Sequence, residues 1–115
     1  MQVDKPQSFI GEVVTVKMDR PLGSVHPKHP EMVYPVNYGF VENTMSSDGA
    51  ELDAYVLGVA KPLEIFKGRC IAFIERENDN DPKLIIVPEG MTLTDDDILE
   101  AVDFQEKYFT SKVIR

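Results

Sequence analysis

Three acidic side chains, Asp48, Glu51 and Asp53, occur within the short segment DGAELD at residues 48–53. This segment leads directly into an apolar stretch that predicts a β-strand over residues 52–57. Carboxylates that cluster where a turn meets a strand suit a hard divalent cation. Mg²⁺ takes one or two carboxylates, keeps several waters, and leaves positions for phosphate oxygens. The residues therefore predict metal-dependent phosphate chemistry, with Asp48 and Asp53 as candidate ligands.

A second acidic turn, ENDND at residues 77–81, can supply a further carboxylate, Asp81. The turn lacks the glycine and the distal glutamate of an EF-hand calcium loop. Taken alone, it is more typical of a solvated hairpin connection, and both interpretations stay open. Two tyrosines precede the first acidic turn. Tyr34 is predicted to be a core aromatic residue whose hydroxyl finds a partner. Tyr38 is predicted to line a site, because the neighbouring Gly39 permits close backbone approach.

The segment YPVNYGFVENTMSSDGAELDA, residues 34–54, resembles the signature region of the soluble family I inorganic pyrophosphatases. Two further motifs extend this resemblance to about residue 109. They are DPKL at residues 81–84, followed by Val87-Pro88, and FQEKY at residues 104–108. The resemblance implies Mg²⁺-dependent hydrolysis of inorganic pyrophosphate to two phosphates, with Mn²⁺ as an alternative cation. It also implies a cytoplasmic homo-oligomer with an OB-like β-barrel.

The resemblance also implies roles for individual residues. The implied metal ligands are Asp48, Asp53 and Asp81, of which Asp48 and Asp53 are also the catalytic candidates. The implied phosphate-binding residues are Lys83, Tyr108 and Tyr38. Residues 1–33 match the family poorly, so Arg20 and Lys28 are weaker candidates for the same task. The segment HPKH at residues 26–29 is not spaced like a zinc site, since the chain has only two histidines and one cysteine.

Three positions depart from the family motifs, and they leave alternatives open. Ala50 and Arg76 stand where the family has metal-binding aspartates, and Phe109 stands where it has a phosphate-binding lysine. Glu51 could enter the space of the missing carboxylate at position 50, and Arg76 could itself neutralise phosphate. One alternative function is a weakened relative that senses phosphate or metal, or acts as a scaffold. Another is an enzyme that hydrolyses a different small diphosphate.

Short strands with polar turns must position these side chains. Strands are predicted over residues 12–18, 52–57, 68–76 and 83–87, with a proline-rich ordered loop over residues 19–35. Thr94 begins a capping box with Asp97, so a helix is predicted from Asp95 to about Phe109, packed on the sheet. The chain is therefore predicted to be mainly β (α+β). The residues alone leave a small barrel and a sandwich open, whereas the resemblance favours a barrel that the helix closes.

Composition restricts the function further. The 115 residues suit one domain over residues 1–115. The net charge of −8, from 12 basic and 20 acidic residues, argues against a nucleic-acid partner, whose phosphates require Lys and Arg. A bound divalent cation would reconcile this acidity with a phosphate substrate. The single cysteine, Cys70, excludes an internal disulfide and fits a reducing cytoplasm. We expect no membrane span, because the sequence has no apolar stretch of sufficient length.

Overall fold

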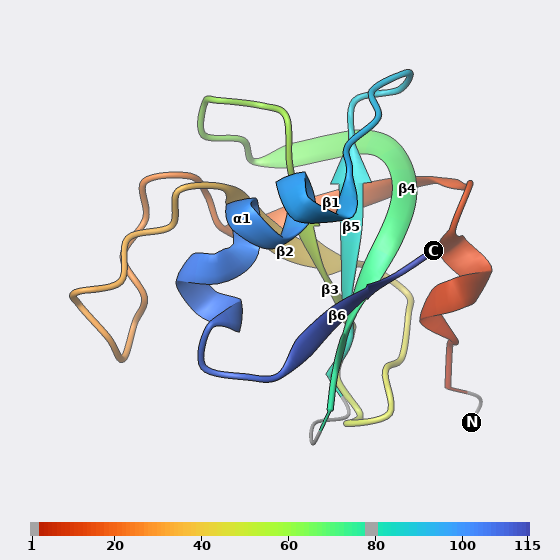
Figure 1. Ribbon diagram of the computed structural model, residues 1–115, viewed down its shortest axis with the longest axis horizontal. Coiled ribbons are helices and arrows are strands. Elements are labelled where there is room, and N and C mark those ends of the chain that lie inside the picture. The colour runs from red at the N-terminus through yellow and green to blue at the C-terminus, as the bar shows by residue number, and fades with distance from the viewer. Residues whose placement is uncertain (1–2, 78–80) are drawn as a thin grey trace.

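The computed structural model describes residues 3–77 and 81–115 (Figure 1). Residues 78–80 of the predicted acidic turn therefore lie outside the described residues. In chain order the elements are η1 (Pro6–Phe9), β1 (Val13–Arg20), β2 (Asn37–Val41), β3 (Leu52–Val56), β4 (Ile65–Arg76), β5 (Lys83–Val87), α1 (Asp95–Glu106) and β6 (Ser111–Ile114).

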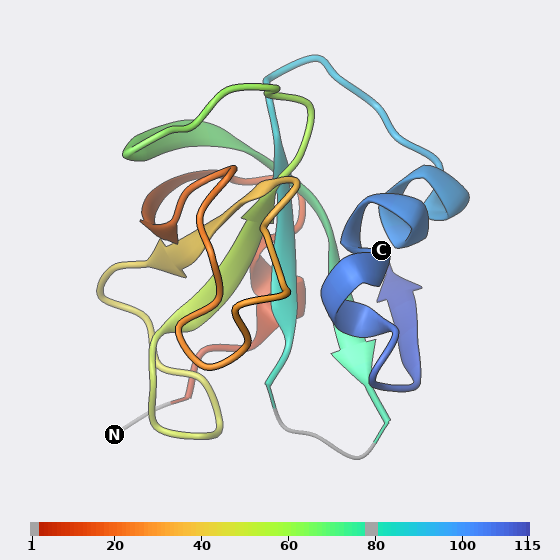
Figure 2. The same ribbon diagram turned by 90° about the vertical axis from the view of Figure 1, so that its left-hand side faces the viewer.

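The first five strands close into a barrel (Figures 1 and 2). Their order is β1-β2-β3-β5-β4, and β1 also pairs with β4 to complete the circle. The pairing of β3 with β5 is parallel, whereas the other pairings of the barrel strands are antiparallel. The long strand β4 continues beyond the barrel and pairs with β6. The expected mainly-β, OB-like barrel with a C-terminal helix is therefore confirmed, and the sandwich alternative is excluded.

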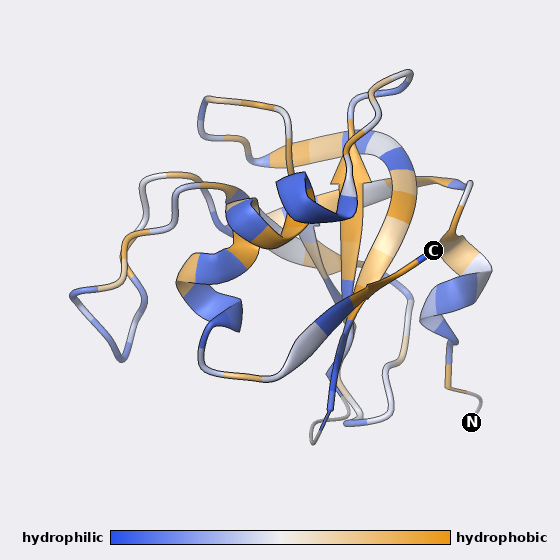
Figure 3. Ribbon diagram, viewed as in Figure 1, coloured by the Kyte–Doolittle hydropathy of each residue, from blue (hydrophilic) through white to orange (hydrophobic). Residues whose placement is uncertain are grey.

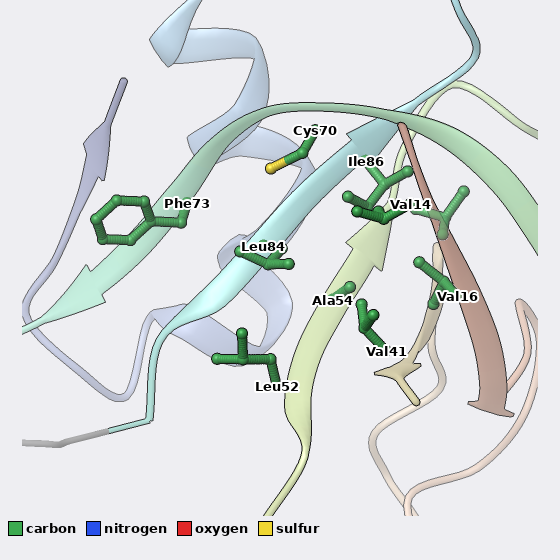
Figure 4. Packing of buried hydrophobic residues seen from close by; sticks show 10 residues of the cluster. Val14, Val16, Val41, Leu52, Ala54, Cys70, Phe73, Leu84 and Ile86 are labelled. Carbon is green, nitrogen blue, oxygen red and sulfur yellow. The ribbon is translucent and has the colours of Figure 1, made fainter. Parts of the chain in front are cut away.

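Alternation along the strands creates two apolar layers. The side chains of Leu52 and Ala54 point from β3 into the barrel, where they meet residues from the other barrel strands (Figure 4). Val56 belongs to the same buried cluster. Tyr55 points the opposite way, into a second layer that includes Ile98 of α1. The strands accordingly contain many hydrophobic residues (Figure 3). Each fully buried aliphatic side chain contributes about 1.5–3 kcal/mol relative to exposure, so α1 is held mainly by this second layer.

Helix α1 begins as the sequence predicts. The Asp97 N–H donates to Thr94 Oγ1 at 3.0 Å, and the Thr94 N–H donates to Asp97 Oδ2 at 3.1 Å, which forms the capping box. The predicted end at Phe109 is wrong, because the helix stops at Glu106. The Phe109 N–H donates to the Glu106 carbonyl in a turn. This turn directs the chain into β6, whose pairing with β4 is incompatible with a longer helix.

The proline-rich segment is an arm with little regular structure. Strand β1 continues to Arg20, so the predicted loop begins slightly later than expected. Within the loop, Val25 and Val33 form an isolated antiparallel bridge. The arm projects from the barrel beside the end of α1 (orange in Figures 1 and 2). Among the described residues, no helix is long and apolar enough to cross a membrane.

Candidate active site

The parallel pairing of β3 with β5 sets Asp53 beside Lys83. The two residues are register partners near the starts of their strands. Their side chains therefore leave the sheet on one face, and Lys83 Nζ lies 2.6 Å from Asp53 Oδ2. Two segments separated by 30 positions in sequence thus form one charged contact. This contact is the centre of the candidate site.

Asp81 completes a three-residue cluster. Its Oδ2 atom lies 2.7 Å from Lys83 Nζ, so one ammonium group bridges two carboxylates. The Lys83 side chain is only 3 % exposed, whereas those of Asp53 and Asp81 are 28 % and 24 % exposed. Burial raises the pKa of Asp81, and the positive charge of Lys83 only partly offsets this. The two carboxylates are therefore partly exposed to solvent, whereas the Lys83 side chain between them is almost fully buried.

Tyr38 forms one wall of the cluster. Its ring centre lies 5.5 Å from Lys83 Nζ, and the Tyr38 side chain is almost completely buried. Burial raises the pKa of Tyr38 far above its ordinary value, and the charge of Asp53 raises it further. The phenol therefore stays protonated and can act only as a neutral hydrogen-bond donor and acceptor at physiological pH.

A depression of about 600 Å³ opens above this cluster, between the arm and the end of α1. The volume is within the range typical of small-molecule sites. Four carboxylates and three permanent cations line it, together with two histidines: Asp19, Glu31, Asp53, Asp81, Arg20, Arg76, Lys83, His26 and His29. These charges nearly cancel, so a highly charged anion would gain little net attraction from the protein alone. A larger depression of about 910 Å³ beside β6 does not include Asp53, Asp81 or Lys83.

A hydrogen-bonded chain of side chains runs beneath the depression. Arg20 donates to the Tyr34 hydroxyl at 2.6 Å, and Tyr34 donates to Gln105 Oε1 at 2.8 Å. Gln105 then donates to the Tyr55 hydroxyl, which donates to Glu106 Oε2, each at 2.6 Å. Each donor points toward Glu106, which fixes the orientation of every member. The prediction that Tyr34 is a core residue with a bonded hydroxyl is confirmed, since it is fully buried.

Arg76 closes this chain from the other side. Its Nε and NH2 atoms donate to both oxygens of Glu106 at 2.9 and 2.7 Å. Its NH1 atom lies 3.9 Å from Asp81 Oδ2, and its guanidinium stacks on the Phe109 ring. Its charge is therefore balanced mainly within the protein. This arrangement makes Arg76 a structural cation of the site rather than a free phosphate-binding group.

Of the three other predicted phosphate-binding residues, two line the depression and one does not. Arg20 and Tyr108 line the depression, and Tyr108 is 64 % exposed. Lys28 is exposed on the arm and is not among the lining residues, and its backbone N–H donates to His26 Nδ1. Arg20 thus reaches the site from β1, whereas Lys28 does not reach it in this conformation.

Asp48 lies in the exposed turn before β3, outside the lining of the depression. Its carboxylate accepts hydrogen bonds from the Ser46 hydroxyl and the Ala50 N–H. These bonds lower the pKa of Asp48, with a small further contribution from the charge of Lys83. The exposed neighbours Glu51 and Ala50 belong to the same turn. In this conformation the Asp48 carboxylate is hydrogen-bonded within its own turn, while its negative charge still acts on Asp81.

The donor set fits one hard cation. Within residues 3–77 and 81–115, no group of three or more His, Cys, Asp or Glu residues is arranged to hold a metal ion. Asp53 and Asp81 nevertheless present two carboxylates to one point. Mg²⁺ is commonly held by one or two carboxylates, with waters and substrate phosphates as the remaining ligands. These two aspartates therefore suit such an ion, and the wider predicted set with Asp48 does not form in this conformation.

Gln105, Glu106 and Tyr55 were not predicted as site residues. A signal in the sequence could have identified Gln105 and Glu106, because they are polar residues at the end of an apolar helical stripe. Such side chains require buried partners. Tyr55 shares a strand face with Asp53 by simple alternation. The identity of the partners could not be read from the sequence, because it depends on where α1 crosses the barrel.

Comparison with known proteins decides the family. A family model described as inorganic pyrophosphatase matches residues 5–113, nearly the whole chain. The chain belongs to the inorganic pyrophosphatase family. The resemblance inferred from the sequence motifs is therefore confirmed.

Curated inorganic pyrophosphatases show how far the similarity extends. The enzyme of Saccharolobus solfataricus is 38 % identical over 81 residues, which is 67 % of this chain and 44 % of the relative. The inorganic pyrophosphatase of Aeropyrum pernix is 32 % identical over 86 residues, 71 % of this chain and 46 % of the relative. These alignments span less than half the length of the relatives.

Solved pyrophosphatase structures share the fold. The inorganic pyrophosphatase of Ehrlichia chaffeensis superposes with a TM-score of 0.67 at 17 % identity, over 95 % of this chain and 86 % of its own. The protein from Coxiella burnetii gives 0.64 at 21 % identity, over 98 % and 88 %. At such identities the likeness concerns the barrel and helix alone.

Proposed function

We propose that this chain hydrolyses inorganic pyrophosphate to two phosphates with the help of a divalent cation, Mg²⁺ or Mn²⁺. The observation that carries the proposal is the convergence of Asp53 from β3, Lys83 from β5 and Asp81 from the segment before β5 at the base of one depression. Membership of the inorganic pyrophosphatase family supports the substrate and the reaction class.

Asp53 and Asp81 would hold the cation, because both expose carboxylate oxygens to the depression. A cation bound there supplies Lewis acidity and a lowered pKa for water. The residues of the chain have separate tasks. Lys83 and Arg20 offset negative charge on the phosphates, and Tyr38 and Tyr108 donate hydrogen bonds to their oxygens. Asp48 and Lys28 would join only if the turn before β3 and the arm move toward the substrate.

The near-cancellation of charge in the depression supports the need for a cation. Pyrophosphate carries several negative charges, and the depression contributes four carboxylates against three permanent cations, one of which, Arg76, is already paired with Glu106. A divalent cation reverses this local balance, because it is the largest charge in the site. The chain alone is therefore expected to bind pyrophosphate weakly, and a chelator is expected to suppress both binding and turnover.

A binding protein without turnover is the second candidate. The observation that favours it is the reduced acidic set, since Asp48 bonds within its own turn and Arg76 is paired with Glu106. Such a protein would still bind cation and diphosphate at Asp53, Asp81 and Lys83. The two candidates share the same site and differ only in whether phosphate is released.

Phosphate release by the purified chain tests the proposal. The assay offers pyrophosphate, a nucleoside diphosphate and tripolyphosphate with Mg²⁺, with Mn²⁺, and with a chelator in excess. We expect release from pyrophosphate that requires the divalent cation. Calorimetric binding of pyrophosphate without release would favour the binding protein, and release from another diphosphate alone would change the substrate. Light scattering of the same sample tests the expected homo-oligomer.

A further inference from the structure

Lys83 fills the position between the two carboxylates that suit a divalent cation. Its Nζ atom contacts Oδ2 of Asp53 at 2.6 Å and Oδ2 of Asp81 at 2.7 Å. The Lys83 side chain is 3 % exposed. Short contacts to two ionised acceptors are charge-assisted hydrogen bonds, about twice as strong as neutral ones. The ammonium group is thus held firmly where a cation has its best ligands.

A divalent cation and this ammonium group cannot use the same oxygens at the same time. Two positive charges a few ångströms apart repel each other strongly in a partly buried site. A cation that binds both carboxylates must therefore separate them from Lys83. Lysine is suited to such a move, because its charge is compact and its four-carbon stem is flexible.

We propose that Lys83 is a built-in competitor for the divalent cation, which displaces its ammonium group from Asp53 and Asp81. The displaced group then turns toward the depression that it already lines. There its ligand is an oxygen of a phosphate group. Displacement of Lys83 from the two carboxylates needs only the cation. The later contact of its ammonium group with a phosphate oxygen rests on the proposed pyrophosphate function.

The competition couples the cation to the anion. Lys83 weakens cation binding when no anion is present, because the cation must break two ion pairs. An anion that forms an ion pair with the ammonium group of Lys83 removes this cost. The site then binds the divalent cation more tightly. By thermodynamic linkage, the bound cation raises the affinity for the anion by the same factor, which is typically 5–150-fold in coupled sites. The site therefore resists loading by cation alone and fills with cation and diphosphate together.

Calorimetric titration of Mg²⁺ and of Mn²⁺, without any anion, tests the competition. Lys83→Met removes the ammonium group and keeps a chain of similar length. We expect this variant to bind the cation at least about tenfold more tightly than the wild type, within the range of coupled sites. Lys112→Met is the matched control, since Lys112 is 70 % exposed in a surface pair with Glu75. The control loses the same charge and should change the affinity less than about twofold.

Equal or weaker cation binding by Lys83→Met, or no binding by either protein, would overturn the proposal. A second measurement uses the wild-type chain, in case the variant does not fold. Acetylation of lysines, followed by mass spectrometry, reports how accessible each amine is. Saturating Mg²⁺ should speed acetylation of Lys83 several-fold and leave Lys112 unchanged. Unchanged or slower acetylation of Lys83 would contradict the displacement. Tighter cation binding by the variant without any pyrophosphate hydrolysis by the wild type would uphold the competition and reject the enzyme.

Discussion

The guanidinium carbon of Arg76 lies 3.8 Å from the centre of the Phe109 ring. These are two of the three positions at which the chain departs from the family motifs, and they contact each other. A cation over an aromatic face is attracted by the ring quadrupole. A lysine at position 109 would instead set a second positive charge beside the guanidinium. The two departures are therefore compatible with each other.

The first prediction concerns the ion pair of Arg76 with Glu106. Their side chains are 6 % and 4 % exposed. Glu106→Gln should lower the free energy of unfolding by about 3–5 kcal/mol, because it leaves a buried charge without its partner. Urea unfolding followed by circular dichroism measures this loss. Asp95→Asn is the control, since it breaks the exposed pair with Arg115 and should cost less than about 1 kcal/mol. Equal losses in the two variants would contradict the structural role of Glu106.

The second prediction concerns acid pH. Burial alone would raise the pKa of Glu106, but hydrogen bonds from Arg76 and Tyr55 outweigh it and lower the pKa below the ordinary value of 4.5. A lowered pKa in the folded state stabilises the fold above the ordinary pKa. This stabilisation is lost as the pH falls through the lowered value. Wild-type stability should therefore decline below about pH 4.5, more steeply than that of Glu106→Gln. Parallel declines, measured by urea unfolding at a series of pH values, would reject this assignment.

The third prediction concerns Gly39. A Cβ atom at this position would lie 2.1 Å from the Lys17 carbonyl oxygen and 2.8 Å from Met18 Cα. The glycine thus permits close approach of β1 to β2, rather than of a ligand to the backbone. Gly39→Ala should lower the free energy of unfolding by at least about 1–3 kcal/mol, the usual cost of overpacking. Thermal unfolding measures the effect. A melting temperature equal to that of the wild type would show that the barrel does not need this contact.

Most of the barrel strands could be anticipated from local pattern, whereas only the family resemblance favoured a barrel over a sandwich. The runs EVVTVKM, LDAYVL and KLIIV are β-branched and apolar, and they fold as strands because burial on one or both faces rewards that pattern. Thr94 and Asp97 form the predicted capping box, since capping depends only on neighbouring residues. Strands β2 and β6 were not predicted, and the segment SKVI of β6 is too short to give a pattern. Its strand conformation comes from pairing with β4.

The candidate site could be anticipated only in part. The contact between Asp53 and Lys83 follows from the parallel pairing of their strands. This pairing depends on the long-range topology of the chain and cannot be read from a local motif. The motif DPKL indicated both Asp81 and Lys83, but not that the ammonium group would bridge two carboxylates. The link from Glu106 to Tyr55 was also hidden, because it depends on the docking of α1 against the sheet. Local residue types thus indicated the chemistry, and packing determined the partners.

The fourth prediction separates two basic residues near the arm. Arg20 lines the depression and donates to the neutral Tyr34 hydroxyl, so its charge is available to an anion. Arg20→Met should lower kcat/KM for pyrophosphate by about 1.5–3 kcal/mol of transition-state stabilisation, the range for hydrogen bonds to charged groups. Lys28→Met removes the same charge from an exposed position outside the lining. Steady-state kinetics should show little change for this variant, and a larger loss at Lys28 than at Arg20 would contradict the assignment.

The most direct test of the account is phosphate release from pyrophosphate with Mg²⁺ by the wild type and by Asp53→Asn. The amide keeps the size of the side chain and removes the charge that a cation and Lys83 both require. We predict Mg²⁺-dependent turnover by the wild type. In the variant we predict a fall in kcat of at least about 100-fold, beyond the 10–100-fold loss usual for partners of metal ligands. Asp103→Asn makes the same chemical change at an exposed helix position and should retain full activity. Retained turnover by Asp53→Asn, or no release of phosphate by the folded wild type, would contradict the account.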